Sequence, residues 1–277
     1  MQTRGWFLGM GTAASLLGLS CAMAVKVEAP PPMAPPVEAP PPKPEPVEAP
    51  PKAEPVKAPK CNSGMVEIHA GTFTMGDAFN AKANATTVDA FCMDTTEVTT
   101  SAYAACVNSG KCTAADTAAL CNAGVPDRGN HPINCVDWPQ AKAYCAAQGQ
   151  RLPSETEWEY AARGTDGRVY PWGNPEPGGQ LCWNGEGNSL GEGNRQSTCA
   201  VASFPGGNSP FGLADMSGNV WEWTSVVFGP TGAGHVTRGG GRYNGDSWNV
   251  RSAYRLGLAT AIQYRDVGFR CAGSISP

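Results

Sequence analysis

Cysteine placement constrains the fold of this chain more than any other feature of its sequence. Ten of the eleven cysteines lie at or after Cys61, and Cys21 stands apart near the N-terminus. An even set of cysteines is typical of disulfides formed in an oxidising compartment. Glycine and asparagine are abundant in the same region and long periodic segments are few. We therefore expect a loop-rich α+β domain that is held together by disulfides.

The disulfide pairing is only partly suggested by spacing. Three pairs of neighbouring cysteines could close local loops, while Cys61 and Cys92 complete the set expected to be oxidised. Spacing alone leaves the connectivity open. The three local pairs are Cys106 with Cys112, Cys121 with Cys135, and Cys182 with Cys199.

Residues 1–24 have the pattern of a secretory signal peptide. Arg4 precedes an apolar run, Trp6 to Leu19, which is shorter than the roughly 20 residues of a membrane-spanning helix. Cleavage after Ala24 is one alternative; a bacterial lipobox ending at Cys21, which would then carry the lipid, is the other. The unpaired cysteine at this boundary favours the lipid anchor. We expect an exported protein of the bacterial envelope, anchored at a periplasmic or outer-membrane surface, or otherwise periplasmic or secreted.

Residues 25–60 form a proline-rich tether. The unit VEAP begins at Val27, Val37 and Val47, and VKAP follows at Val56. Such a composition buries little apolar surface and favours extended polyproline II, at roughly 3.1 Å per residue. The domain that follows, residues 61–277, is mildly acidic and has no basic run, which argues against nucleic acid as a partner.

Local patterns predict several secondary-structure elements. Alternating residues on both sides of Ala70-Gly71 favour a hairpin of residues 66–69 with 72–75, and a further strand is expected over 88–93. Thr99 or Thr100 can cap a helix that runs to about Val107.

Two further helices have clear start signals. Asp137 can cap a helix that would bury Ala141, Tyr144 and Cys145 on one face. Ser154 and Glu157 form a capping box, in which each side chain accepts a backbone N–H of the other residue. The buried stripe of that helix would be Trp158, Ala161 and Ala162.

Seven separated motifs occur in one order along the chain. Together they resemble the formylglycine-generating enzyme family, also called sulfatase-modifying factor domains. This resemblance implies a single α+β domain with a C-type-lectin-like core and a long-range disulfide between Cys145 and Cys271. The motifs are GTFTMG (71–76), TTEVTTSAY (95–103), RLPSETEWEYAARG (151–164), YPWGN (170–174), FGLADMSGNVWEWT (211–224), RGGG (238–241) and GFRC (268–271).

The tryptophans of these motifs, Trp158, Trp172, Trp221 and Trp223, are expected to be core anchors. Glu222 stands between two of them, and a buried carboxylate must be paired or coordinate a cation.

Two alternatives are open for Glu222. The resemblance implies a structural Ca²⁺ held by its side chain together with backbone carbonyls, and oxygen ligands suit that ion. The implied carbonyls belong to Ser217, Gly218 and Val220. Otherwise Glu222 pairs with an arginine such as Arg238 or Arg255.

The resemblance also shows what the chain lacks. Enzymes of the family hold Cu(I) with two cysteines five residues apart, whereas this chain has Asn244 and Asn249 there, and Gly241 in place of a nearby serine. Soft thiolates select Cu(I) and neutral amides do not, so no copper is expected. The iron-dependent sulfoxide synthases of the superfamily need a histidine triad. The domain's three histidines, His69, His131 and His235, are scattered along the sequence and have no ligand spacing.

A mixed polar and aromatic surface remains around the altered positions. It suits hydrogen-bonded recognition of a sugar or an extended peptide; alternatively, these loop residues satisfy one another. We expect an exported, lipid-anchored binding or scaffold module without oxidase activity, whose partners are the membrane and an envelope protein, peptide or glycan. The alternatives are a formylglycine-generating oxidase with atypical ligands and calcium-supported carbohydrate binding. The surface comprises Arg242, Tyr243, Asn244, Asp246, Trp248 and Asn249.

Overall fold

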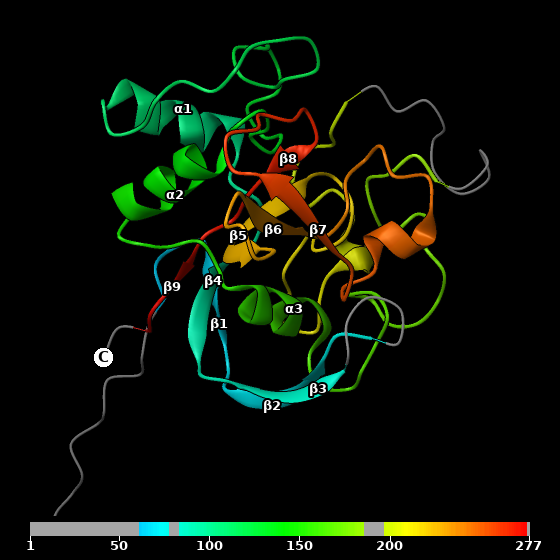
Figure 1. Cartoon of the computed structure of the whole chain (residues 1–277). Helices are drawn as coiled ribbons and strands as arrows, with labels where there is room; N and C mark the ends of the chain where they lie inside the picture. The colour runs from blue at the N-terminus through cyan, green and yellow to red at the C-terminus, as the bar shows by residue number, and fades with distance from the viewer. Residues whose placement is uncertain (1–60, 78–82, 186–196, 276–277) are drawn as a thin grey trace, which may run out of the picture. The chain divides into compact units, whose positions relative to one another are not determined.

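The computed structural model describes residues 61–77, 83–185 and 197–275 (Figure 1). The predicted signal peptide, the lipid-anchor candidate Cys21 and the proline-rich tether lie outside the described residues. Three helices, several short strands and many loops make up this region, as expected for an α+β domain. Among the described residues, no helix is both long enough and apolar enough to span a membrane.

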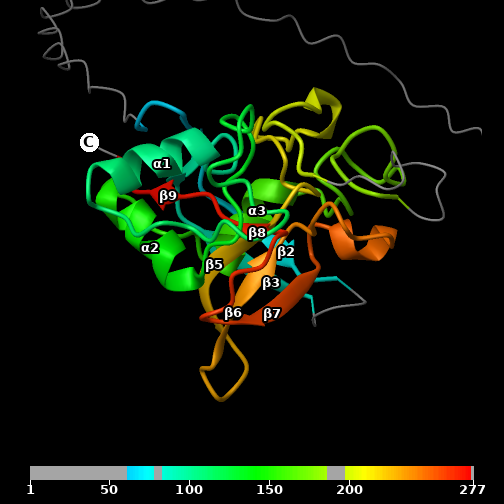
Figure 2. The same ribbon diagram turned by 90° about the horizontal axis from the view of Figure 1, so that it is seen from above.

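The largest sheet has four strands in the order β7-β6-β5-β8. Strands β5 (Trp221–Phe228), β6 (Gly234–Arg238) and β7 (Arg255–Ala259) are antiparallel neighbours, and β8 (Val267–Gly268) runs parallel to β5. The loop from β5 to β6 extends beyond the rest of this sheet (Figure 2).

Two smaller sheets complete the β structure. Strands β1 (Met65–Ile68), β4 (Phe91–Asp94) and β9 (Ala272–Gly273) form one sheet, and β2 (Gly71–Met75) pairs with β3 (Asn84–Val88) in the other.

The predicted hairpin is therefore wrong, although both of its strands exist. Strand β1 pairs with β4 and strand β2 pairs with β3, so the Ala70-Gly71 turn links two sheets. The strand predicted over 88–93 is interrupted at the exposed Asp89 and Ala90: Val88 ends β3, and residues 91–93 belong to β4. Alternation of apolar and polar residues identified the strands, but it carries no information about which strand is the partner.

The three predicted helices are confirmed. Helix α1 (Thr100–Asn108) is capped by Thr99, α2 (Trp138–Ala147) by Asp137, and α3 (Glu155–Arg163) by Ser154. Both α2 and α3 begin with a full capping box, and their predicted stripes are buried. Helices α1 and α2 lie side by side (Figures 1 and 2), whereas α3 contacts β2, β3, β5 and β6 and so lies between two sheets.

All ten cysteines among the described residues form disulfides. The three local pairs suggested by spacing are confirmed, and so is the pair implied by the resemblance. Cys145 in α2 is thereby joined to Cys271 next to β9 across 126 residues of sequence. The pairs are Cys61–Cys92, Cys106–Cys112, Cys121–Cys135, Cys145–Cys271 and Cys182–Cys199.

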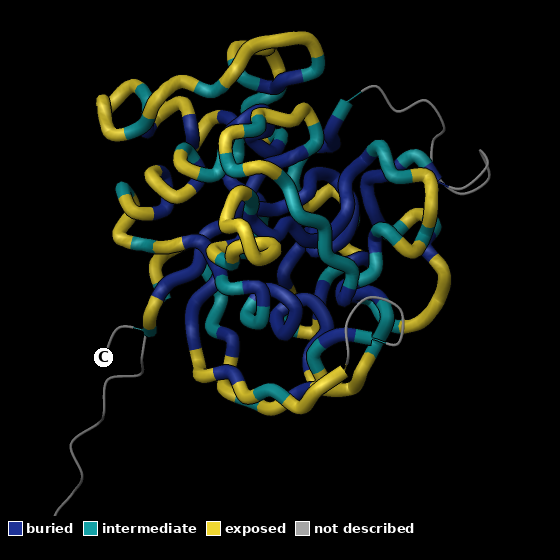
Figure 3. Tube along the Cα trace, viewed as in Figure 1, coloured by how far each residue is buried: buried dark blue, intermediate teal, exposed yellow. Residues whose placement is uncertain are grey.

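The buried residues lie at the centre of the domain, where the tube in Figure 3 is dark blue. Trp158, Trp221 and Trp223 are buried as predicted. Trp172 is only partly buried and stacks on Tyr170 with ring centroids 5.0 Å apart. Large aromatic side chains thus supply core area in a domain with short helices.

Candidate functional site

A cavity of about 310 Å³ lies beside the four-stranded sheet, and both Asn244 and Asn249 line it. We call it the groove. Its walls come from β5, β7 and β8, from the loop before β8, and from the segment that follows β6. The lining residues are Trp221, Asn244, Asn249, Tyr254, Leu256, Leu258, Tyr264, Asp266 and Val267.

Two glycines bring the segment after β6 against the core. Gly239 and Gly240 have φ angles of +92° and +76°, which side chains rarely adopt. A Cβ atom at Gly240 would lie 2.8 Å from the carbonyl oxygen of Asn249. The RGGG motif therefore permits the tight turn that places Asn244 and Asn249 at one cavity.

Both asparagines take part in the local hydrogen bonding of this segment. The side-chain Oδ1 of Asn244 accepts from the N–H of Gly241 at 2.6 Å, and its own N–H donates to the Gly241 carbonyl at 3.0 Å. The N–H of Asn249 donates to the carbonyl of Asp246 at 3.1 Å. The expectation that these loop residues satisfy one another is thus met in part.

Aromatic rings form the wall and rim of the groove. Tyr254 contacts Trp221 with centroids 5.8 Å apart and Trp248 edge-on at 4.7 Å. Trp248 and Tyr264 are each 46% exposed, so ring faces remain accessible to a ligand. The carboxyl of Asp266 lies at the same cavity, and burial raises its pKa above the ordinary value.

The six residues predicted to bind a ligand therefore do not form one continuous surface. Asn244 and Asn249 line the groove, and Trp248 joins it through Tyr254. Asp246 is exposed and does not line the groove. Arg242 and Tyr243 do not line it either; the Arg242 guanidinium lies 4.0 Å from the centroid of the Tyr243 ring.

Sequence reasoning missed several residues of the groove. Leu256 and Leu258 alternate along β7, and this spacing could have predicted that they share one face. Tyr264 and Asp266 lie in a loop with no recognisable pattern and reach the groove only through the fold.

Glu222 meets an arginine. Its carboxylate accepts from Nε and Nη2 of Arg270, both at 2.7 Å, and from Nε1 of Trp158 at 2.7 Å. Glu222 and Arg270 are both completely buried. This geometry favours the ion-pair alternative, because the charge of Glu222 is already balanced and both of its oxygens are engaged.

The arginine that pairs with Glu222 is not one of the two considered from the sequence. Arg238 forms ion pairs with Glu159 and Glu155, and Arg255 pairs with Glu155 at 2.7 Å. Arg270 belongs to the GFRC motif, 48 residues beyond Glu222.

The three histidines have separate surroundings. His69 lies 3.3 Å from Glu67, His131 contacts the Thr198 hydroxyl at 2.7 Å, and His235 stacks on Trp138 at 3.8 Å. Within the residues that the structure describes, no group of three or more His, Cys, Asp and Glu side chains could hold a metal ion. The side chains at the two altered positions are neutral amides and do not fit Cu(I).

Comparison with known proteins identifies the domain. The family described as "Sulfatase-modifying factor enzyme 1-like domain" matches residues 51–275. The chain is 38% identical over 167 residues to the mouse "Inactive C-alpha-formylglycine-generating enzyme 2"; the match covers 54% of this chain and 52% of that protein, so about half of each. It is 32% identical to the "Formylglycine-generating enzyme" of Streptomyces coelicolor, over 79% of this chain and 91% of that enzyme.

The solved structure of PvdO from Pseudomonas aeruginosa has a similar fold. It superposes with a TM-score of 0.62 at 26% identity, over 76% of this chain and 94% of that chain. The expected fold class is thereby confirmed.

Proposed function

Because the chain belongs to the sulfatase-modifying factor family, we propose that it uses the family fold to bind a ligand in the groove without oxidising it. The proposal depends on one observation above all: each cysteine of the described residues is in a disulfide, and the two altered positions carry amides. A copper-dependent oxidase of this family needs a pair of thiolates at those positions.

Family membership alone does not decide between catalysis and binding. The similar proteins include one named as a formylglycine-generating enzyme and one named as inactive. The choice between catalysis and binding therefore depends on the chemistry of the side chains at the site. Amide nitrogen and oxygen are hard donors, and Cu(I) binds them poorly compared with thiolate sulfur.

The groove has the composition of a recognition site. Exposed ring faces of Trp248 and Tyr264 stand near the amides of Asn244 and Asn249 and the carboxyl of Asp266. Such a combination can stack on an apolar ligand face and hydrogen-bond its polar groups, which suits a sugar or an extended peptide.

Export and lipid anchoring belong to the same proposal. The five disulfides support a domain that matures in an oxidising compartment. A lipid on Cys21 followed by the proline-rich tether would hold the groove away from a membrane surface. An envelope protein, peptide or glycan would then be the partner.

The decisive assay is aldehyde formation. We would incubate the purified full chain with a Cys-x-Pro-x-Arg peptide, copper and oxygen, using the Streptomyces coelicolor enzyme as the positive control. We expect no formylglycine by mass spectrometry. Aldehyde formed by this chain would refute the proposal and favour an oxidase with atypical ligands.

Binding is tested on glycan and peptide arrays with native protein, Trp248→Ala and Tyr264→Ala. We expect each variant to weaken a native signal by about fivefold, since stacking of one ring contributes on the order of 1 kcal/mol. Phe228→Ala is the matched control. Phe228 is an exposed aromatic that packs at Gly257, on the face of β7 opposite Leu256 and Leu258. Equal loss in all three variants would place the ligand elsewhere.

A further inference from the structure

Apart from Arg251, the arginines that the structure describes fall into two groups. Six of them pair with carboxylates. Arg128, Arg242 and Arg265 form no ion pair with a carboxylate in the part of the chain that the structure describes. The six pairs are Arg151–Glu157, Arg163–Glu159, Arg168–Asp166, Arg238–Glu159, Arg255–Glu155 and Arg270–Glu222.

Arg242 is the least satisfied of the three. Its residue is completely buried, and its Nε and Nη1 atoms have no hydrogen-bond acceptor among residues 61–77, 83–185 and 197–275. Its backbone is fixed by Asn219 and Asn184, with both hydrogen bonds 2.9 Å long. Burying N–H donors of a charged group without an acceptor is costly, so this position favours a bound acceptor.

Arg265 lies beside Arg242, and Arg128 is near enough for its charge to act on Arg242. The guanidinium of Arg265 lies 4.5 Å from the centroid of the Tyr243 ring, which Arg242 also contacts. Burial lowers the pKa of Arg242; Tyr243 and Asp266 act to raise it, and the charges of Arg265 and Arg128 act to lower it. The three like charges repel one another, and Asp266 is the carboxyl group that opposes this repulsion.

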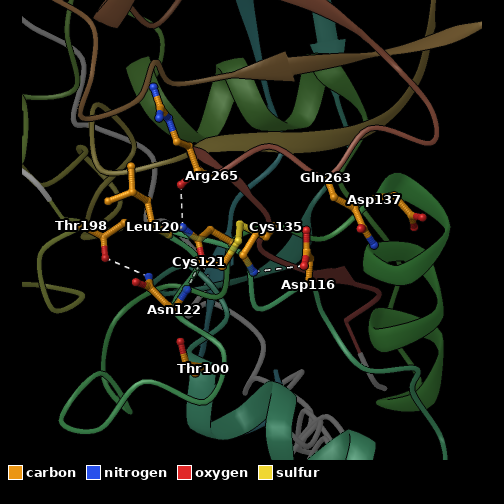
Figure 4. Close-up of a disulfide and its surroundings, with 12 residues drawn as sticks. Thr100, Asp116, Leu120, Cys121, Asn122, Cys135, Asp137, Thr198, Gln263 and Arg265 are labelled. Carbon is orange, nitrogen blue, oxygen red and sulfur yellow. Dashed lines mark hydrogen bonds between the residues drawn. A yellow bond between two sulfur atoms is a disulfide. The ribbon is translucent and has the colours of Figure 1, made fainter.

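A buried polar network holds this arginine cluster. The Asn122 amide accepts from Nη1 of Arg128 at 2.8 Å and donates to the Thr198 hydroxyl at 2.9 Å. Asn134 donates to the Arg265 carbonyl at 2.5 Å. Figure 4 shows Asn122, Thr198 and Arg265 around the Cys121–Cys135 disulfide. This disulfide closes the loop that carries Arg128. The side chain of Arg128 and the backbone of Arg265 are therefore held in place by the protein itself.

We propose that Arg242, together with Arg265 and Arg128, binds an oxyanion beside the groove. A carboxylate, sulfate or phosphate oxygen can accept the unused N–H groups of Arg242 and offset the repulsion within the cluster. The cluster adjoins the groove: Asp266 lines the groove, and the charges of both Arg242 and Arg265 act on its carboxyl group. The anion is either free or an acidic group of the groove ligand, and only the second case rests on the proposed function.

Inorganic sulfate is the first probe. We would titrate the full chain with sodium sulfate, keep the ionic strength constant with sodium chloride, and follow Tm by calorimetry. We expect a saturable rise of about 2 °C or more in the native protein. Arg242→Gln should abolish the saturable rise, and Arg265→Gln and Arg128→Gln should reduce it. The exposed Arg265 side chain makes its variant informative even if Arg242→Gln folds poorly.

Arg168→Gln is the control, because Arg168 already pairs with Asp166 at 2.6 Å. Sulfate also stabilises proteins without binding a site, and that general effect should be equal in all variants. A saturable rise that persists in Arg265→Gln and Arg242→Gln would overturn the proposal. So would the absence of a saturable rise in the native chain.

Glucuronate and glucose distinguish the two sources of the anion. If the acidic group belongs to a groove ligand, glucuronate should bind more tightly than glucose and lose affinity in both Arg265→Gln and Tyr264→Ala. If Tyr264→Ala leaves glucuronate binding unchanged, the oxyanion site stands and the proposed function loses support. Loss in Tyr264→Ala but not in Arg265→Gln would support the groove and overturn the oxyanion site.

Discussion

Two charged regions of this domain, each built around a buried arginine, differ in how their arginines are satisfied. In the first, which we call the ionic framework, Arg270 and Arg238 bind Glu222 and Glu159. In the arginine cluster of Arg128, Arg242 and Arg265, donors are left without acceptors among the described residues. In the first region a carboxylate balances the charge of each guanidinium, and Nε of Arg238 is the one nitrogen of this pair of arginines without an acceptor among the described residues. In the second region, two buried N–H groups of Arg242 have no acceptor among the described residues, which is the observation behind the proposed oxyanion site.

The two regions also differ in the sign of their excess charge. Around Arg270 lie Asp94, Glu97 and Asp215 as well as Glu222, so carboxylates outnumber the guanidinium. Around Arg242 the excess is positive, and Asp266 is the acidic group that acts on it. The framework is therefore sensitive to protonation of its acids, and the cluster is sensitive to added anions.

Removing one partner of the framework should have the largest effect. Arg270→Met leaves Glu222 buried without its counter-charge, which should lower the free energy of unfolding by about 3–5 kcal/mol. Urea unfolding of native protein and variant measures the change. Adding Glu222→Gln to Arg270→Met should recover much of the loss. A double variant no more stable than the single one would contradict the framework.

A disulfide comparison separates stability from ligand binding. Replacing Cys121 and Cys135 by serine should cost about 3 kcal/mol, from the entropy of opening a loop of this size. It should also weaken the sulfate response, because this disulfide supports Asn122 and the cluster. Replacing Cys145 and Cys271 should cost at least as much stability and leave the sulfate response intact. Equal sulfate responses in the two variants would argue against the scaffold described for the cluster.

The pH dependence of stability tests the acid excess of the framework. Burial raises the pKa of Asp94 from 3.8 to about 6. Between these values the folded chain binds more protons at Asp94 than the unfolded chain, so the free energy of unfolding should fall as pH rises from about 4 to 6.

Asp94→Asn should remove that contribution and stabilise the protein at pH 7 by about 1–2 kcal/mol. The asparagine Oδ1 can still accept from the N–H of Cys271, as Asp94 does at 2.8 Å. Urea unfolding at pH 4.5, 5.5 and 7 measures how the free energy of unfolding of the native protein and of the variant changes with pH. Parallel pH profiles for variant and native protein would show that Asp94 is not the source.

A chelator should have the smallest effect. If Arg270 neutralises Glu222, EDTA should leave Tm unchanged within about 1 °C. If Ca²⁺ is held by Glu222 with the carbonyls of Ser217, Gly218 and Val220, EDTA should lower Tm and added calcium should restore it. Glycan binding lost in EDTA would favour calcium-supported carbohydrate binding.

How much of this could be predicted depends on the range of the interaction. The N-cap at Asp137 and the capping box at Ser154 were predictable because the hydrogen-bond partners of a cap lie three residues away. The distant Cys145–Cys271 pair was implied only by the family motifs. Strand partners, and Arg270 as the partner of Glu222, depend on the tertiary fold, and local sequence patterns do not contain that information.

The site shows the same limit. The sequence identified Asn244 and Asn249 because they replace expected cysteines in a recognisable motif. It grouped Arg242 with them by proximity in the chain, although burial and missing acceptors place Arg242 in a different cluster. No sequence pattern reports that a donor lacks a partner.

Copper binding tests the central claim most directly. The native full chain, with its disulfides kept oxidised, would be titrated with Cu(I) against a chromophoric competitor and then examined by X-ray absorption. Because amides occupy positions 244 and 249 and the domain's cysteines are oxidised, we predict no stoichiometric Cu(I) in the domain and no copper–sulfur signal from it. One equivalent of tightly bound Cu(I) with sulfur ligands inside the domain would contradict a non-oxidising binding module.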